Sequence, residues 1–148
     1  MTAADSPTGR RLTPRGAKTR AKIVASAADL MYVNGVGATT LDDVIAASAV
    51  SKSQLYHHFS GKHALVRAVI DHTGDRIIER ERDSLGHVST IAGLRRWRDA
   101  LVQNNALRHG AYGCALGSLA SEVADHDEVA RQTLSDLFTA WKELLADV

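Results

Sequence analysis

Apolar residues recur along this chain at the spacing of a helix rather than that of a strand. Over residues 15–34, Ile23, Ala27 and Met31 follow an i, i+4, i+8 pattern, which places them on one helix face. Similar spacing predicts further helices over residues 41–47, 52–59, 62–84, 91–108 and 116–124, and a last one that starts after Asp125 or Asp127. No segment alternates as a half-buried strand does, so the pattern predicts an all-α fold.

Polar residues at the starts of two predicted helices define where these helices begin. Thr40 with Asp43, and Ser51 with Gln54, have the spacing of a capping box at a helix start. The link between the second and third predicted helices, residues 48–50, has only three residues. Two short helices joined by so tight a link have the arrangement of a helix-turn-helix.

The last predicted helix carries an apolar stripe that is still in phase at the final residue. Its members are Leu134, Leu137, Phe138, Trp141, Leu145 and Val148. Such a stripe requires a covering surface, and no Gly, Asn or Pro ends the helix. We therefore expect that a second chain covers the stripe or that the natural protein continues, which would leave this C-terminal half incomplete.

The composition fits one domain, or one small domain joined to part of a second. The 148 residues are 45% hydrophobic, which is enough for a buried core. A single cysteine excludes an internal disulfide framework and favours a reducing cytosol. No apolar run is long enough to cross a bilayer, and the first residues lack the apolar region of a secretory signal. We expect a cytoplasmic protein without a membrane partner, with a flexible tail over residues 1–14.

The net charge of +1 hides a difference between two parts of the chain. Residues 1–62 hold eight Lys and Arg against four Asp and Glu, a net charge of +4. Residues 63–148 hold ten Lys and Arg against thirteen Asp and Glu, a net charge of −3. A basic N-terminal part joined to a mildly acidic remainder favours contact of the N-terminal part with a polyanion. Many neutral domains show a charge difference of this size.

The segment VSKSQLYHHFSGK, residues 50–62, carries the most informative chemistry. On a helical wheel Leu55, Phe59 and His58 fall on one side, which predicts that they face the core. The outward residues are Ser53, Gln54, Tyr56 and His57, with Lys52 at their flank. A helix face of hydrogen-bonding, aromatic and cationic groups suits the major groove of DNA, which accepts one α-helix.

Three of these side chains match known contacts with base edges. Gln54 can bond adenine bidentately, Lys52 can reach guanine or a phosphate, and Ser53 tolerates several partners. The competing interpretation of the same pattern is an ordinary helical hairpin with one solvated face. A DNA-binding prediction needs charge and motif together, so periodicity alone leaves these two interpretations about equally favoured.

Phosphates are expected beside the second and fourth predicted helices. The hydroxyl of Thr39 or Thr40 and the free N–H groups at the start of the second helix can donate to a phosphate. Lys62, at the start of the fourth helix, is expected to meet another phosphate. The predicted contacts therefore surround the third helix on two sides.

The stretch TTLDDVIAASAVSKSQLYHHFSGKHALV resembles the helix-turn-helix signature of the TetR family of transcriptional regulators. The matching features are Thr39-Thr40, an apolar second helix, Val50-Ser51-Lys52, Leu55 to Phe59, and Lys62 with Ala64-Leu65. The likeness extends over about residues 19–69. It implies base contacts for Lys52, Ser53 and Gln54, backbone and some base contacts for Tyr56 and His57, and phosphate contacts for Thr40 and Lys62.

The resemblance also implies how the whole protein is organised. Family members are all-helical homodimers whose ligand-binding usually releases the DNA. Residues 15–61 would form the DNA-binding domain, and residues 62–148 the effector-binding and dimerisation domain. The dimer would bind a palindromic double-stranded operator, with two copies of the third helix in successive major grooves. Members usually carry two helices more than the seven predicted here, which is a departure in length.

Several residues of the second half are candidates for the pocket of an unknown small-molecule effector. They are Trp97, Asn104, Asn105, His109, Tyr112, Cys114 and Trp141. Such pockets are mostly apolar with a few polar groups, but either tryptophan also suits plain core packing. Cys114 has two further interpretations, a small buried hydrophobe and an oxidation sensor. The stretch YGCALGSLASEVAD, residues 112–125, resembles a G-C-x-x-G-x-L-x-x-E segment found in one branch of the family.

Two other classes of protein compete with a ligand-responsive repressor. An enzyme is disfavoured, because the chain has no G-x-S-x-G, no Gly-rich phosphate loop and no H-E-x-x-H. His57 and His58 point apart on the wheel and no cysteine or carboxylate cluster joins them, so neither a metal site nor a cofactor is expected. The second alternative is a DNA-binding protein without an effector, which a tightly filled second half would favour.

Overall fold

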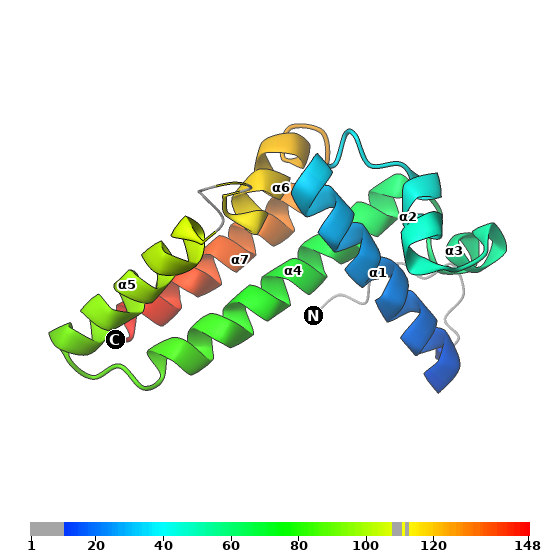
Figure 1. The fold of residues 1–148 in the computed structure, drawn as a ribbon. Coiled ribbons are helices and arrows are strands. Elements are labelled where there is room, and N and C mark those ends of the chain that lie inside the picture. The colour runs from blue at the N-terminus through cyan, green and yellow to red at the C-terminus, as the bar shows by residue number, and fades with distance from the viewer. Residues whose placement is uncertain (1–10, 108–110, 112) are drawn as a thin grey trace.

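The computed structural model describes residues 11–107, 111 and 113–148. Within these ranges the chain forms seven α-helices and no strand, so the all-α prediction is confirmed (Figure 1). The helices are α1 (Pro14–Asn34), α2 (Leu41–Ser48), α3 (Lys52–His58), α4 (Lys62–Leu85), α5 (Ile91–Ala106), α6 (Ala115–Val123) and α7 (Glu128–Ala146). Their ends lie within one or two residues of the predicted ones. No helix in the described ranges combines the length and apolarity that a bilayer span requires.

The long helix α4 connects the two ends of the molecule. In Figure 1, α2 and α3 lie near its first turns, α1 crosses it, and α5 lies at its far end. The last helix, α7, packs along α4 and runs in the same direction (Figure 1). A Cβ on Gly74 would lie 2.4 Å from Leu137 Cδ1, so any larger residue at this position would force the Leu137 side chain to shift.

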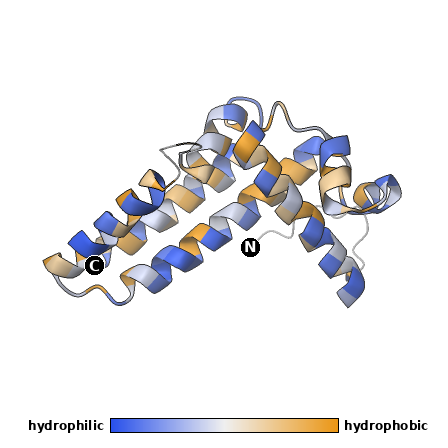
Figure 2. Ribbon diagram, in the orientation of Figure 1, coloured by the Kyte–Doolittle hydropathy of each residue, from blue (hydrophilic) through white to orange (hydrophobic). Residues whose placement is uncertain are grey.

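One continuous apolar core joins the helix-turn-helix to the C-terminal helices. Ile23, Ala27 and Met31, the predicted stripe of α1, are all buried in it. Leu65 of α4 and Leu116 of α6 are fully buried in the same core. Figure 2 shows apolar and hydrophilic positions alternating along α1 and α4, as expected of helices with one buried face. The helix-turn-helix end is therefore built on the same core as the rest of the chain.

Helix α5 is packed much less than its neighbours. Of its residues only Gly93 is buried, whereas Ile91 and Val102 are 67% and 62% exposed. Its side-chain tie to α4 is Trp97, whose Nε1 donates to Glu81 Oε2 at 2.9 Å. Because Glu81 is only 1% exposed, this hydrogen bond is shielded from water and connects α5 to the body of the molecule.

Candidate nucleic-acid interface

Helix α3 is short, and contacts at both of its ends hold it in place. The Ser51 N–H donates to Gln54 Oε1 at 2.8 Å and the Gln54 N–H donates to Ser51 Oγ at 3.1 Å, which confirms the predicted capping box. Leu55 is fully buried, and so is almost all of Phe59, which follows the helix. The Arg20 guanidinium of α1 lies 5.0 Å from the centre of the Phe59 ring. A helix of this length is marginal alone, so its stability depends on these contacts.

The outward face of α3 has the composition predicted for it. Its exposed residues are Lys52, Ser53, Gln54, Tyr56 and His57. His58, predicted to face inward, is partly buried, and its burial lowers its pKa below the ordinary 6.5, with smaller effects from His57 and Arg20. Figure 1 places α3 at the opposite end of the molecule from α5. The exposed face is therefore presented at one end of the structure.

Gln54 has a structural role in addition to its predicted base contact. A bidentate contact with adenine uses the side-chain oxygen as acceptor and the amino group as donor. In this structure the oxygen already accepts the Ser51 N–H. Reading adenine in this way competes with the capping box, so a substitution of Gln54 affects both the start of α3 and the base contact.

The turn between α2 and α3 covers residues 49–51, one residue later than predicted. The reason is that Ser48 is still helical, with its buried hydroxyl donating to the Val44 carbonyl at 2.6 Å. Ala49 then reverses the chain with a φ of +52°, in the left-handed region. This conformation costs about 1–2 kcal/mol for a residue with a Cβ, and it fixes the angle between the two helices.

The start of α2 is less open to a phosphate than the sequence suggested. The Thr40 N–H donates to Asp43 Oδ2 at 2.8 Å, and the Asp43 N–H donates to Thr40 Oγ1 at 3.1 Å, so the predicted capping box is present. Hydrogen bonds from Thr40 lower the pKa of Asp43 below its ordinary 3.8, which keeps the carboxylate ionised at neutral pH. Asp42 adds a second acid to the same turn. Two of the amides expected for a phosphate are thus already engaged.

Thr39 and Lys62 differ in how well they suit a phosphate. Thr39 is 1% exposed, and its hydroxyl donates to the Gly35 carbonyl at 2.8 Å. The prediction of a phosphate contact by this hydroxyl is therefore wrong, because the hydroxyl caps the chain at the end of α1 instead. Lys62 begins α4 and is partly exposed, with Nζ 3.5 Å from the Gly37 carbonyl. Its phosphate contact stays a prediction.

The polar candidates for an effector pocket that the structure describes do not converge on one site. Asn104 and Asn105 are exposed on α5. Cys114 is exposed at the start of α6, which contradicts its interpretation as a small buried hydrophobe. His109 and Tyr112 lie outside the described residues.

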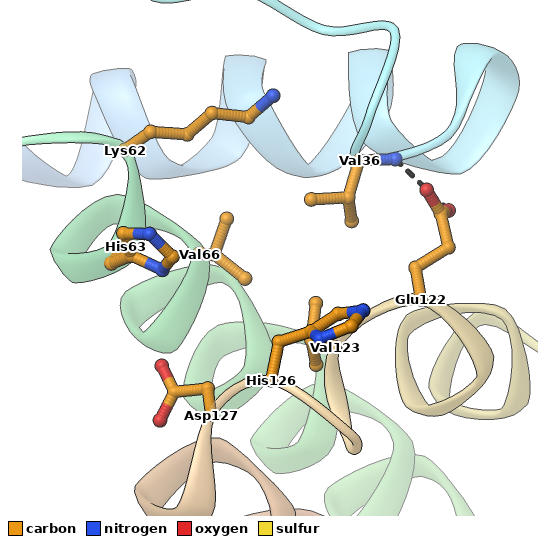
Figure 3. A pocket seen from close by; sticks show the side chains of 8 residues that line it. All are labelled: Val36, Lys62, His63, Val66, Glu122, Val123, His126 and Asp127. Atoms are coloured by element: carbon orange, nitrogen blue, oxygen red, sulfur yellow. Dashed lines mark hydrogen bonds between the residues drawn. The ribbon is translucent and has the colours of Figure 1, made fainter.

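The tryptophan candidates and the observed pocket lie apart. Trp97 donates a hydrogen bond to Glu81, and Trp141 is partly buried on α7. A pocket of about 220 Å³ lies between the loop after α1, the start of α4 and the end of α6 (Figure 3). Its lining residues are Val36, Lys62, His63, Val66, Glu122, Val123, His126 and Asp127. None of the predicted effector residues that the structure describes lines this pocket, which is formed by three segments far apart in sequence.

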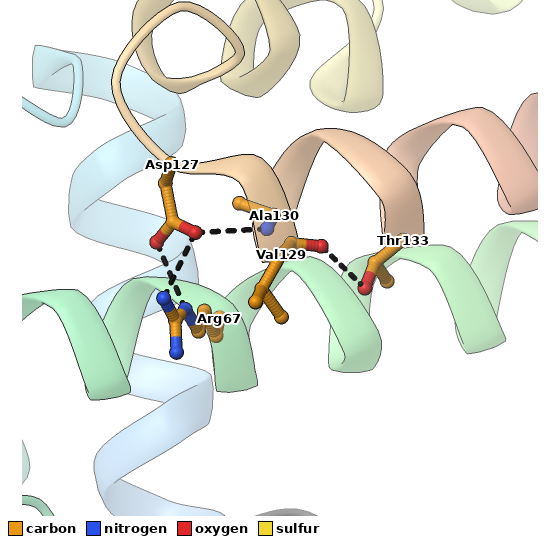
Figure 4. A network of polar contacts seen from close by, with 5 residues as sticks. All are labelled: Arg67, Asp127, Val129, Ala130 and Thr133. Atoms are coloured by element: carbon orange, nitrogen blue, oxygen red, sulfur yellow. Dashed lines mark hydrogen bonds and ion pairs between the residues drawn. The ribbon is translucent and has the colours of Figure 1, made fainter. Parts of the chain in front are cut away.

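An ion pair ties the start of α7 to α4 (Figure 4). Arg67 donates through Nε and Nη2 to the two oxygens of Asp127, at 2.8 and 2.9 Å, and the Ala130 N–H donates to Asp127 Oδ1 at 3.0 Å. The hydrogen bond from Arg67 is the main cause of a pKa for Asp127 below the ordinary 3.8. Asp127 was recognisable as a helix start, but nothing in the sequence indicated Arg67 as its partner.

Glu122 of α6 reaches back to the loop between α1 and α2. Its two carboxylate oxygens accept the Val36 N–H and the Gly37 N–H, both at 2.9 Å. Glu122 is the acid of the G-C-x-x-G-x-L-x-x-E stretch, so a signal was present in the sequence. The interaction was missed because its donors are main-chain amides, which no side-chain pattern marks.

Known proteins share both the motif and the fold of this chain. The family model for bacterial regulatory proteins of the tetR family matches residues 23–69, from α1 into α4. An uncharacterized HTH-type transcriptional regulator in the lacX 3' region of Lactococcus lactis subsp. lactis is 28% identical over 137 residues, covering 87% of this chain and 67% of that protein. An HTH-type transcriptional repressor of Mycobacterium tuberculosis is 36% identical over 100 residues, covering 59% of this chain and 53% of that protein. The chain thus spans about half to two thirds of these relatives.

The likeness extends to solved structures. The crystal structure of regulatory protein TetR from Rhodobacter sphaeroides matches with a TM-score of 0.74 at 21% identity, covering 87% of this chain and 69% of that one. This match establishes a shared fold, and the matches to the family model and the relatives add the sequence relationship. The helix-turn-helix part of the chain, residues 23–69, thus matches the tetR family of bacterial regulatory proteins, and the relatives named above are transcriptional regulators.

Proposed function

We propose that this protein is a DNA-binding transcriptional repressor that a small molecule releases from its operator. The observation that carries the proposal is the exposed face of α3, which stands on the buried Leu55 inside a family-matched helix-turn-helix. Residues 15–61 act as the DNA-binding unit. Residues 62–148 supply the effector and dimer contacts.

In the proposed complex α3 lies in the major groove. Lys52, Ser53 and Gln54, at its start, meet the edges of the bases, because the first residues of a recognition helix point at the groove floor. Tyr56 and His57, one turn further on, reach the sugar-phosphate backbone. The exposure of all five side chains supports this arrangement.

Thr40 and Lys62 meet phosphates on either side of α3. Thr40 Oγ1 accepts the Asp43 N–H, which leaves its own hydrogen available to a phosphate oxygen. The ionised Asp43 opposes this contact, and the nearby positive charge of Lys62 offsets part of that repulsion. Lys62 therefore provides the stronger of the two phosphate contacts.

A homodimer presents two copies of α3 to a palindromic operator. Their separation must equal one helical turn of DNA, about 34–36 Å, or a multiple of it. The effector binds among the helices of residues 62–148 and favours a different separation, so repression is lost to the extent that it prefers that state. A crystal structure of protein purified from cells, searched for bound density in this region, checks the effector directly.

One observation favours the alternative, a DNA-binding protein without an effector. Leu137 of α7 lies directly on Gly74 of α4, so the two helices leave no space for a ligand where they touch. If the remaining space between α4 and α7 is filled in the same way, binding to DNA is constitutive. The same crystal structure separates the two functions.

Selection from a random pool of duplex DNA tests the proposed function. The wild-type protein is expected to enrich a two-fold symmetric sequence and to bind it more tightly than random DNA. Gln54→Ala should lose about 1–3 kcal/mol of preference for the selected site. Gln103→Ala, an exposed glutamine on α5, is the matched control and should bind as wild type. Failure of the wild-type protein to enrich any sequence would overturn the proposal.

Salt dependence tests the phosphate contact of Lys62. Lys62→Ala should weaken binding to all sequences and reduce the slope of log Kd against log salt by about one unit for each phosphate that the lysine neutralises in the wild-type complex. Lys142→Ala, an exposed lysine on α7, should leave the slope unchanged. An unchanged slope for Lys62→Ala contradicts the proposed phosphate interaction.

A further inference from the structure

The loop between α1 and α2, residues 35–40, is held in place by a side chain from the C-terminal half. Figure 3 shows Glu122 pointing from α6 to the main chain at Val36. Both of its oxygens are used, one by the Val36 N–H and the other by the Gly37 N–H, at 2.9 Å each. A carboxylate that accepts two main-chain N–H groups makes two charge-assisted hydrogen bonds, which are stronger than neutral ones.

Two glycines shape the loop around this carboxylate, and they differ in importance. Gly35 has a φ of +86°, and a Cβ there would lie 3.1 Å from Glu122 Oε1. Gly37 has no such backbone restriction, and its Cβ would lie 3.7 Å from Glu122 Oε2, an ordinary contact. The loop therefore requires glycine at position 35 for both its conformation and its space, but not at position 37.

The loop leads directly into the elements proposed to bind DNA. Thr39 donates its hydroxyl to the Gly35 carbonyl at 2.8 Å, so the two ends of the loop are joined. Thr40 follows at once as the N-cap of α2, and Lys62 Nζ lies 3.5 Å from the Gly37 carbonyl. The position of the loop therefore sets the start of α2 and the surroundings of a proposed phosphate contact.

We propose that Glu122 is a positioning residue for DNA binding. By holding the loop over residues 35–40, it sets how α2 and α3 are presented to the groove, so that a displacement of α6 changes the affinity for DNA. The Tyr32 hydroxyl of α1 also donates to the Gly113 carbonyl at 3.1 Å. This second hydrogen bond between the same parts of the molecule supports the proposed coupling. The inference rests on the proposed function and adds to it the residue through which the C-terminal half controls the DNA-binding end.

The sign of the expected effect separates positioning from plain electrostatics. Removing an acid near a polyanion strengthens binding when charge alone matters. Glu122→Gln removes the charge but keeps the shape, and its NH2 group, a donor, replaces one of the two oxygens that accept these N–H groups. Positioning predicts the opposite result, a loss of DNA affinity of about fivefold or more, the size of a typical coupling between sites.

The experiment compares Glu122→Gln with Glu143→Gln, which removes an exposed acid from α7. Amide hydrogen exchange and the Kd for the selected DNA are measured for both variants and for the wild-type protein. We expect Glu122→Gln to exchange at least about tenfold faster over residues 35–40, with α7 unchanged, and to bind DNA more weakly. The slope of log Kd against log salt should stay as in the wild type, because the substitution removes no group that neutralises a phosphate.

Each outcome shows whether the loop over residues 35–40 and the affinity for DNA are coupled through Glu122. Unchanged exchange over residues 35–40 in Glu122→Gln overturns the inference, as does faster exchange with an unaltered Kd. If the wild-type protein selects no DNA, the proposed function has failed, and the exchange data then show only whether Glu122 holds the loop. The two failures are therefore distinguishable.

The two glycines provide a second test that leaves Glu122 intact. Gly35→Ala strains the loop and crowds the carboxylate, so it should reproduce the faster exchange and the weaker DNA binding of Glu122→Gln. Gly37→Ala is the matched control and should behave as wild type in both measurements. Equal behaviour of the two alanine variants contradicts the proposed geometry, even if Glu122→Gln does not fold.

Discussion

Helices α3 and α5 lie at opposite ends of the molecule and are held in opposite ways (Figure 1). α3 has only 7 residues, but it starts with a complete capping box and buries Leu55 fully. α5 has 16 residues and buries only Gly93, and its side-chain tie to α4 is Trp97. The length of a helix therefore does not decide how firmly it is anchored. Burial of one apolar side chain in the core anchors a short helix, whereas a longer helix with an exposed surface gains little free energy from packing.

The largest effect should come from breaking the anchor of α3. Leu55→Ala leaves a cavity under the helix and should lower the free energy of unfolding by about 3 kcal/mol. Val102→Ala makes the same kind of change on α5, where the side chain is 62% exposed, and should stay within about 0.5 kcal/mol of wild type. Urea unfolding of the two variants measures the difference. Similar losses in both would mean that α5 is packed as firmly as α3.

The next effect concerns the ion pair that anchors the start of α7 to α4. Asp127→Ala removes both the cap of α7 and the partner of Arg67, and should cost about 2–3 kcal/mol, since Arg67 is partly exposed. Asp136→Ala, an exposed acid on the same helix, is the control. Thermal unfolding measures both, and a loss below about 0.5 kcal/mol for Asp127→Ala would show that the pair contributes little.

A smaller and local effect is expected at α5. Trp97→Phe keeps an aromatic ring but removes the N–H that Glu81 accepts, which should cost about 1–2 kcal/mol because the carboxylate is buried. Amide exchange in α5 should accelerate while α3 keeps its protection. Trp141→Phe is the matched control, because its Nε1 has no hydrogen-bond partner in the described part of the chain. Faster exchange in both helices would contradict the view that α5 is tied separately.

The smallest effect is a pH dependence of stability at the helix-turn-helix end. Burial lowers the pKa of His58 below 6.5, so the unfolded chain binds this proton more readily than the folded one. The stability from the neutral ring is fully present above pH 6.5 and is lost as the pH falls below that value through the folded pKa. His58→Gln should therefore lose less stability than wild type between pH 7 and about pH 5, by urea unfolding. An identical loss in the two proteins would contradict the assignment.

Much of the helix-turn-helix end could be predicted because its signals are local. A capping box links residues three apart, and an apolar stripe repeats within one helix, so Ser51, Gln54 and Leu55 carry their own structural information. The outward direction of Lys52 and Tyr56 followed from the same wheel. Thr39 was misplaced because its neighbour Thr40 has the same side chain, and only the tertiary fold shows which hydroxyl is buried.

The sequence by itself determined the helices, their starts, and the exposed face of α3, since each depends on residues within a turn or two of one another. The tertiary structure alone decided which distant groups meet. It joined Arg67 to Asp127, Trp97 to Glu81, and Glu122 to the loop after α1. The physical reason is that these partners are polar groups brought together by burial of the core, and a buried polar group must find a partner wherever the packing of apolar faces places one.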